Sequence, residues 1–190
     1  MKNNFRKGFL SIAFAALAFL AAPALANAAA PANAAGNPAP EAGQISLEQQ
    51  VRHQLVMLPW YSVFDNLEYQ VEGSKVTLSG QVVLPILKSS AYDAVRSLRG
   101  VEEVDNQIEV LPASPFDSQI RREAYRTIFS MPQLSKYSMG VNPDIHIVVD
   151  NGHLTLEGAV LNQTDKDVAG LRANQVPNVF SVTNNLRVQE

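Results

Sequence analysis

A repeat in fixed register constrains this chain more than any other feature. The segment VEGSKVTLSGQV, residues 71–82, returns as VDNGHLTLEGAV, residues 149–160, which lies 78 positions later with no gap. The same offset relates GVEEVDNQIEV, residues 100–110, to NVFSVTNNLRV, residues 178–188. Two segments in one common register indicate that a whole supersecondary unit was duplicated. The sequence therefore predicts one small fold that occurs twice.

The N-terminal segment, residues 1–26, is typical of a secretory signal peptide. Its basic start, MKNNFRKG, leads into an apolar run over residues 9–25, and Ala-Leu-Ala at residues 24–26 suits a signal peptidase. We therefore expect an exported protein of the periplasm or cell envelope whose mature chain begins at Asn27, with an uncleaved membrane anchor as the alternative. The chain has no cysteine, so it has no lipidated cysteine at the cleavage site.

Composition narrows the possible partners and chemistries. Residues 27–44 are mostly Ala, Pro, Asn and Gly, which predicts a disordered linker. Without the three basic residues of the signal segment, 12 basic residues remain against 18 acidic ones, a net charge of −6. Such a chain is no general nucleic-acid binder, because that binding requires Lys and Arg to neutralise phosphates. The absence of cysteine excludes disulfides and thiolate sites.

Apolar residues at helical spacing predict two helices in each copy. The first helix of copy one begins after Ser46 and has as its inner positions Leu47, Val51, Leu55 and Leu58. Its counterpart begins near Ser114 and has as its inner positions Phe116, Ile120, Ala124, Ile128 and Met131. A second helix follows Pro85 and runs to Arg99, with inner positions Leu87, Ala91, Ala94 and Leu98. Gly100 caps it, and Asn178, the next most tolerant residue type, takes that place in copy two.

Alternating apolar and polar residues predict a hairpin between the two helices of each copy. The inward positions are Leu67, Tyr69, Val71, Val76 and Leu78 in copy one, and Ile145, Ile147, Val149, Leu154 and Leu156 in copy two. The turns are Gly73-Ser74 and Asn151-Gly152, the second of which is a strong hairpin signal. Gly80 and Gly158 recur after the return strand's leucine and indicate a bulge or a close backbone approach.

The resulting order is α-β-β-α-β, twice. The closing strands, Glu103 to Val110 and Ser181 to Val188, are expected to run parallel to a neighbour because the preceding helix acts as a crossover. Each unit is then a two-layer α+β fold, in which a three-stranded mixed sheet has two helices packed on one face. We expect the units to occupy residues 45–112 and 114–189.

The combined pattern resembles the BON domain family. The shared features are the Gly or Asn turn, the motifs V-T-L-S-G and L-T-L-E-G, a helix, and then G-V-x-x-V-x-N-x-I-x-V. The resemblance covers residues 46–189, and copy two departs from it by Asn178 and by about nine additional residues before its hairpin. It implies a secreted or periplasmic protein with two BON domains and no enzymatic activity, one that associates with phospholipid membranes, often in stress responses.

The residues themselves offer little catalytic chemistry. The chain contains no G-x-S-x-G, P-loop or H-E-x-x-H motif. Of the three histidines, the hairpin register places His146 opposite Glu157 and His153 opposite Asp150, both pairs on the outward face. The two histidines lie at opposite ends of the hairpin and cannot share a metal ion. We therefore expect no catalytic residues, no metal and no cofactor.

The main candidate surface lies on the first helix of copy two. The arc opposite its inner face carries Arg121, Arg122, Tyr125, Arg126 and Phe129. Arginines with interleaved aromatic rings are typical of a helix that meets anionic lipid headgroups. The alternatives are that Tyr125 and Phe129 form the contact between the repeats, or that the arginines are simply solvated. The matching arc of copy one, with Arg52, His53 and Val56, is a much weaker candidate surface.

A second candidate contact surface follows Pro59, where Trp60, Tyr61 and Phe64 fall in a short link. Aromatic residues near the end of a core helix either cover that core or contact a partner. Together these features favour a non-enzymatic envelope protein that binds anionic phospholipid surfaces in envelope maintenance or a stress response. A periplasmic protein-binding module, either a chaperone or a scaffold for envelope proteins, is the alternative. No nucleic acid is expected as a partner, and the oligomeric state stays open.

Overall fold

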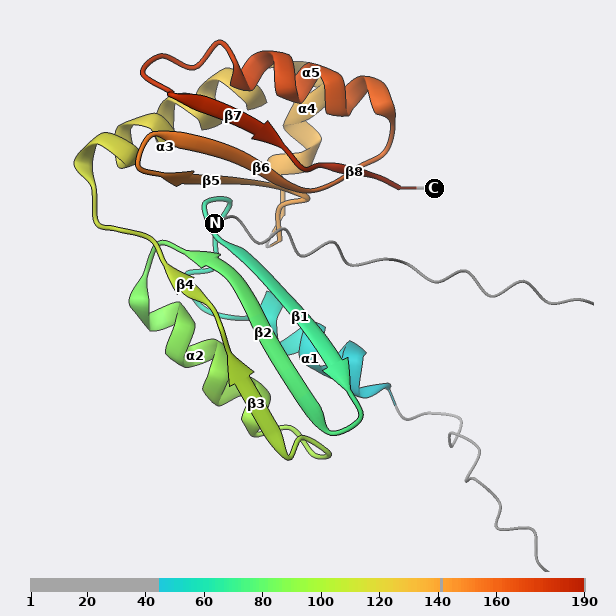
Figure 1. Cartoon of the computed structure of the whole chain (residues 1–190). Helices are drawn as coiled ribbons and strands as arrows, with labels where there is room; N and C mark the ends of the chain where they lie inside the picture. The colour runs from blue at the N-terminus through green and yellow to red at the C-terminus, as the bar shows by residue number, and fades with distance from the viewer. Residues whose placement is uncertain (1–44, 141, 190) are drawn as a thin grey trace, which may run out of the picture. The chain divides into compact units, whose positions relative to one another are not determined.

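The computed structural model describes residues 45–140 and 142–189, which belong to one compact unit (Figure 1). The predicted signal peptide, residues 1–26, and the predicted linker, residues 27–44, lie outside these described residues. Among the helices of residues 45–140 and 142–189, none has the length and apolar character needed to cross a membrane.

The predicted order of elements is confirmed in both repeats. The first repeat consists of α1 (Leu47–Val56), β1 (Asn66–Glu72), β2 (Lys75–Val82), α2 (Pro85–Arg96), β3 (Glu103–Asn106) and β4 (Glu109–Val110). The second consists of α3 (Pro115–Phe129), α4 (Pro132–Ser135), the 3-10 helix η1 (Lys136–Ser138), β5 (Ile145–Asp150), β6 (His153–Val160), α5 (Gln163–Ala173), β7 (Ser181–Asn184) and β8 (Arg187–Val188). In each repeat the two long helices pack on the sheet and on one another, as Figure 1 shows. The fold class is therefore α+β, as expected.

Each sheet is mixed, and its last strand is broken in two. β1 pairs with β2 in antiparallel fashion, and both β3 and β4 run parallel to β2. The break follows Asn106, whose side chain donates to the carbonyl of Lys88 at 2.9 Å and accepts from the amide of Ile108 at 3.3 Å. Asn184 makes the matching two bonds in the second repeat. The asparagine shared by both copies thus binds the crossover helix to the sheet.

The recurring glycines mark a close backbone approach, as predicted. A Cβ atom on Gly80 would lie 2.1 Å from the carbonyl oxygen of Asn66, and one on Gly158 would lie 2.1 Å from that of Asp144. Both glycines also have positive φ, at 102° and 113°. Any side chain there would force the two strands apart, so the motif specifies the fold rather than a binding site.

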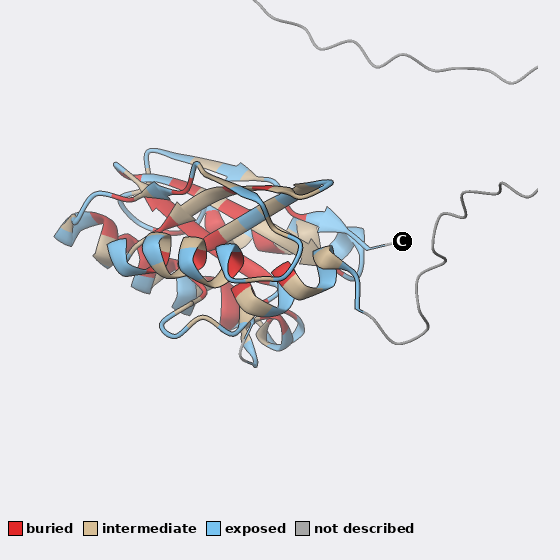
Figure 2. Ribbon diagram, turned by 90° about the horizontal axis from the view of Figure 1, so that it is seen from below, coloured by how far each residue is buried: buried red, intermediate tan, exposed pale blue. Residues whose placement is uncertain are grey.

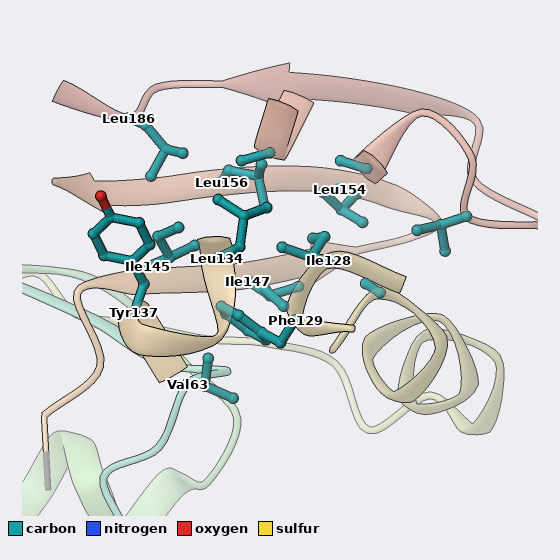
Figure 3. Packing of buried hydrophobic residues seen from close by; sticks show 14 of the residues in the cluster. Val63, Ile128, Phe129, Leu134, Tyr137, Ile145, Ile147, Leu154, Leu156 and Leu186 are labelled. Atoms are coloured by element: carbon teal, nitrogen blue, oxygen red, sulfur yellow. The ribbon is translucent and has the colours of Figure 1, made fainter. Parts of the chain in front are cut away.

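The two repeats have separate cores of unequal size. The first contains nine buried apolar residues, and the second contains 17. In Figure 2 the buried residues (red) lie on both the strands and the helices. One member of the larger core, Val63, comes from the first repeat and lies with Phe129 and Ile147 in Figure 3. The amide of Ile147 also donates to the carbonyl of Val63 at 2.7 Å.

The additional residues of copy two form α4 and η1 and complete the larger core. Leu134 and Tyr137 are buried there. The hydroxyl of Tyr137 donates to the carboxylate of Asp165 at 2.5 Å and accepts from the amide of Leu161 at 2.9 Å. Lys136 pairs with the same carboxylate at 3.1 Å. This segment therefore acts as a structural part of the second repeat.

Several predicted inward positions were wrong in detail. Phe116 is 43% exposed, and it packs on Phe180 with ring centres 6.1 Å apart instead of entering the core. In α2 the third buried position is Val95, whereas Ala94 is only half-buried. The helix ends at Arg96, three residues earlier than expected, so its buried stripe is shorter and rotated by one position.

Candidate functional site

The N-terminus of α3, the helix that carries the main candidate surface, is held by the hydroxyl of Ser114 and the carboxylate of Asp117. Ser114 caps the amide of Asp117 at 3.1 Å. Asp117 is itself buried, and its two oxygens accept from the amides of Asn151 at 3.2 Å and Gly152 at 2.8 Å. The helix is thereby attached to the β5–β6 turn. This attachment determines which of its faces meets the sheet.

Arg121 does not lie on the outward face, which corrects the prediction. It is only 3% exposed, and its guanidinium donates to the carbonyl of Val149 at 2.6 Å. Burial lowers the pKa of Arg121, while Asp117 and Asp65 act in the opposite direction by stabilising its charge. A buried charge requires such compensation. Arg121 therefore joins helix and hairpin, and it is not available to a surface ligand.

Phe129 is likewise an interior residue. It is 9% exposed and belongs to the larger core together with Val63 of the first repeat. A helical wheel assumes that only the face toward the sheet is buried. In α3 the link from the first repeat covers a second face, in the C-terminal half of the helix. Phe129 thus lies at the contact between the repeats, which was the alternative prediction. The expected outward orientation was wrong.

Three residues of the predicted arc remain exposed, Arg122, Tyr125 and Arg126. Arg126 pairs with Glu123 at 3.0 Å on the surface, a type of pair that stabilises little. Within residues 45–140 and 142–189 Arg122 forms no ion pair. Tyr125 is 39% exposed, and its ring centre lies 5.0 Å from that of Phe129 and 6.3 Å from that of Phe64.

The link between α1 and β1 places its three aromatic residues in three different environments. Trp60 is 74% exposed and has a positive φ of 72°. Tyr61 packs on the first core, and burial raises its pKa to about 12. Phe64 packs on the second core. The prediction that such residues cover a core thus fits two of them, and Trp60 is left on the surface.

Asp65 holds this link in shape. Its carboxylate accepts from the amide and hydroxyl of Ser62, at 3.0 and 2.6 Å, and from the amide of Val83 at 2.7 Å. A bulky residue with positive φ costs of the order of 1–3 kcal/mol and persists only where surrounding bonds determine the conformation. The link therefore presents Trp60 outward at an energetic cost, which favours a role for this side chain in a contact.

The structure brings the two predicted candidate sets together. A groove of about 350 Å³ with a mostly apolar lining runs between them and is formed by Trp60, Ser62, Phe64, Asp65, Val83, Leu84, Ser118, Arg121 and Arg122. Leu84, which is 41% exposed, was not predicted, because it lies between β2 and α2 outside any aromatic or basic pattern. We define the arginine–aromatic surface as Trp60, Phe64, Leu84, Arg122, Tyr125 and Arg126.

The comparison with known families decides where the chain belongs. The family model described as BON domain matches residues 46–112 and again residues 117–190. The chain belongs to the BON domain family. BON domains are non-enzymatic and are associated with phospholipid membranes. Within residues 45–140 and 142–189, moreover, no group of three or more His, Asp or Glu side chains is arranged to hold a metal ion.

Two solved structures resemble the BON repeats at low similarity. One is the C-terminal domain of CdsD, a structural protein of the type III secretion system of Chlamydia trachomatis, with 15% identity over 77% of this chain and 99% of that one, at a TM-score of 0.30. The other comes from structural studies of the same protein, with 15% identity over 77% and 94% of the two chains and a TM-score of 0.28. Among curated proteins none matches this chain.

Proposed function

We propose that this BON protein is an exported, non-enzymatic envelope protein that binds anionic phospholipid surfaces through its arginine–aromatic surface, in envelope maintenance or a stress response. The observation that carries the proposal is Trp60, a tryptophan held outward on the same groove as Arg122, with the exposed Tyr125 packed on Phe64 of that groove. Tryptophan and tyrosine rings favour the headgroup level of a bilayer, and nearby arginines meet the phosphates. The overall charge is acidic, so attraction to anions requires a local cluster of this kind.

Co-sedimentation with vesicles of phosphatidylglycerol and phosphatidylcholine tests the proposal. The double variant Arg122→Glu/Arg126→Glu should weaken binding to the anionic vesicles roughly tenfold or more, because each basic residue near such a surface contributes about 1 kcal/mol. A matched control is Arg52→Glu/Arg99→Glu, which makes the same charge change at exposed positions of the first repeat. Equal losses in the two double variants would contradict a localised surface. Binding should also fall with added salt.

Trp60 supplies an independent readout because it is the only tryptophan in the chain. Its fluorescence should shift to shorter wavelength when anionic vesicles are added, since the ring leaves water for the interface. An unchanged spectrum, under conditions in which the protein sediments with the vesicles, would show that a different surface makes the contact.

The second candidate function is a protein-binding module, a periplasmic chaperone or scaffold. A specific feature favours it: Phe180 and Phe116 are exposed at 70% and 43% beside the turn of the second hairpin, where the first repeat has Glu102 and Leu47. Exposed apolar patches often mark protein contacts. Salt-independent suppression of client aggregation that is lost in Phe180→Ser would favour this function over lipid binding.

A further inference from the structure

His146 lies where the first repeat covers the second sheet. It is in β5, it is only 7% exposed, and its ring centre lies 5.6 Å from that of Tyr61 in the link of the first repeat. The register with Glu157 is the predicted one, but the expectation that His146 faces solvent was wrong because the link covers this face. The corresponding position of the first repeat is Glu68, which is exposed.

The surroundings of His146 suit a neutral ring. Its Nδ1 atom is buried and has no hydrogen-bond partner among the described residues. Neutral imidazole has only one N–H donor, whereas imidazolium has two, so protonation would bury both a charge and an unpaired donor. Burial lowers the pKa of His146 below 6.5, and the backbone carbonyls of Asp65 and Ser62 oppose that shift.

The charged groups that face His146 come from several elements. Asp65 in the link and Asp144 before β5 favour its protonated form. The oxygens of Asp65 are already bonded to Ser62 and to the amide of Val83, and the cross-strand partner Glu157 accepts from Asn185 at 2.7 Å. His146 also lines a cavity of about 260 Å³, whose other charged lining residues include the cations Arg52 and Arg187 and the anion Glu68. The carboxylates of Asp65 and Glu157 thus have partners of their own, whereas the buried Nδ1 of His146 has none among the described residues.

We propose that His146 makes the joint between the two repeats sensitive to acid: when the ring takes up a proton, the link residues 61–65 separate from β5 and the repeats move apart. The direction of the pH effect follows because the buried ring in the closed joint disfavours proton uptake. The closed joint has its full stability above the ordinary pKa of 6.5 and loses it as the pH falls below that value. Each pH unit below that value shifts the ratio of open to closed joint by up to about tenfold.

This inference does not depend on the proposed lipid binding. Only its regulatory consequence does: the arginine–aromatic surface takes Trp60 and Phe64 from the first repeat and Arg122 and Tyr125 from the second. Opening the joint would separate these halves, so that acid would weaken lipid binding.

Distance measurements across the joint test the inference. The chain has no cysteine, so spin labels can be placed at Ser97→Cys and Thr164→Cys, two exposed positions in different repeats. In the unaltered background the distance distribution should broaden between pH 7.5 and 4.5. In His146→Phe, which keeps an aromatic ring against Tyr61 but cannot titrate, it should stay narrow. His153→Gln and His53→Gln change exposed histidines and should behave like the unaltered background.

Two results would overturn the inference. One is a distance distribution that does not change with pH in the unaltered background; the other is a change that persists in His146→Phe. NMR titration of the His146 ring in the chain without substitutions provides a test that depends on no variant. A titration at or above 6.5, with the Tyr61–His146 contact intact throughout, would also overturn the inference. Because none of these measurements uses lipid, a failure of the lipid proposal would remain distinguishable.

Discussion

The two repeats have the same fold on cores of different depth. After the buried Asn66, the first strand of the first sheet alternates between half-buried and exposed side chains, while in β5 all residues but the last are buried. The larger core also gains Leu134 and Tyr137 from the additional segment and Val63 from the link. The duplicated hairpin supplies the same positions in both cases. The difference therefore comes from segments outside the repeated register, and the second repeat should be the more stable one.

The largest expected effect concerns the glycines that the repeats share. Gly80→Ala and Gly158→Ala should each destabilise their own repeat by about 3 kcal/mol or more, because the new methyl group would collide with a backbone oxygen. With its smaller core, the first repeat should then lose its fold, whereas the second should keep partial protection. Amide hydrogen exchange of β2 and β6, measured by NMR, separates the two repeats.

Gly73→Ala is the matched control for these variants. Gly73 also has a positive φ, 64°, but a Cβ atom there would meet nothing within 4 Å. Its cost should be about 1 kcal/mol, from the backbone conformation alone. If Gly73→Ala were as damaging as Gly80→Ala, the collision with the strand would not be the cause.

Leu134→Ala should bring the second repeat closer to the first. Removing a fully buried leucine costs about 3 kcal/mol, and no residue of the first repeat corresponds to it. Exchange in β6 should become faster while that in β2 stays constant. Leu171→Ala, at a position 65% exposed, should change neither strand. Unchanged exchange in β6 would mean that the additional segment does not account for the difference between the two cores.

Tyr137→Phe should cost about 1–2 kcal/mol because the amide of Leu161 loses its only described partner and Asp165 loses a donor. The hydrogen bond from Tyr137 lowers the pKa of Asp165, assisted by Lys136. The stabilisation is therefore complete above the ordinary value of 3.8 and is lost as the pH falls below it. The free energy of unfolding, measured by denaturation between pH 3 and 7, should therefore fall less steeply at the acidic end in the variant than in the unaltered protein. Tyr92→Phe should leave the pH dependence intact.

The smallest expected effect lies in the turn after the crossover helix, at a position where the repeats differ. The helices end at Arg96 and Ala173, so the prediction that Gly100 and Asn178 cap them was wrong. Asn178 has a positive φ of 64°, and Gly100 has one of 95°. Asn178→Gly should stabilise the second repeat by a few tenths to about 1 kcal/mol, and Gly100→Asn should cost the first a similar amount. Thermal denaturation measures both. Changes of the same sign in the two variants would contradict the role assigned to this position.

The repeat made most of the fold predictable. The hairpin pairs His146 with Glu157 and Asp150 with His153 as expected, and Asn151 takes its positive φ, because turn chemistry and alternation are local properties. The candidate site was harder to predict. Arg121 and Phe129 are buried by segments that are distant in sequence, so a helical wheel of α3 alone misplaced them. Leu84 carries no pattern at all, and only the groove beside Arg122 reveals it.

The bond between Val63 and Ile147 has a consequence for solubility. β5 is an edge strand of the second sheet, and an unpaired edge is a template on which another chain can form a further strand. The first repeat occupies part of that edge and covers the apolar face beside it. A fragment that begins after residue 113 would expose both, and it should associate with itself under conditions in which the two-repeat chain stays monodisperse.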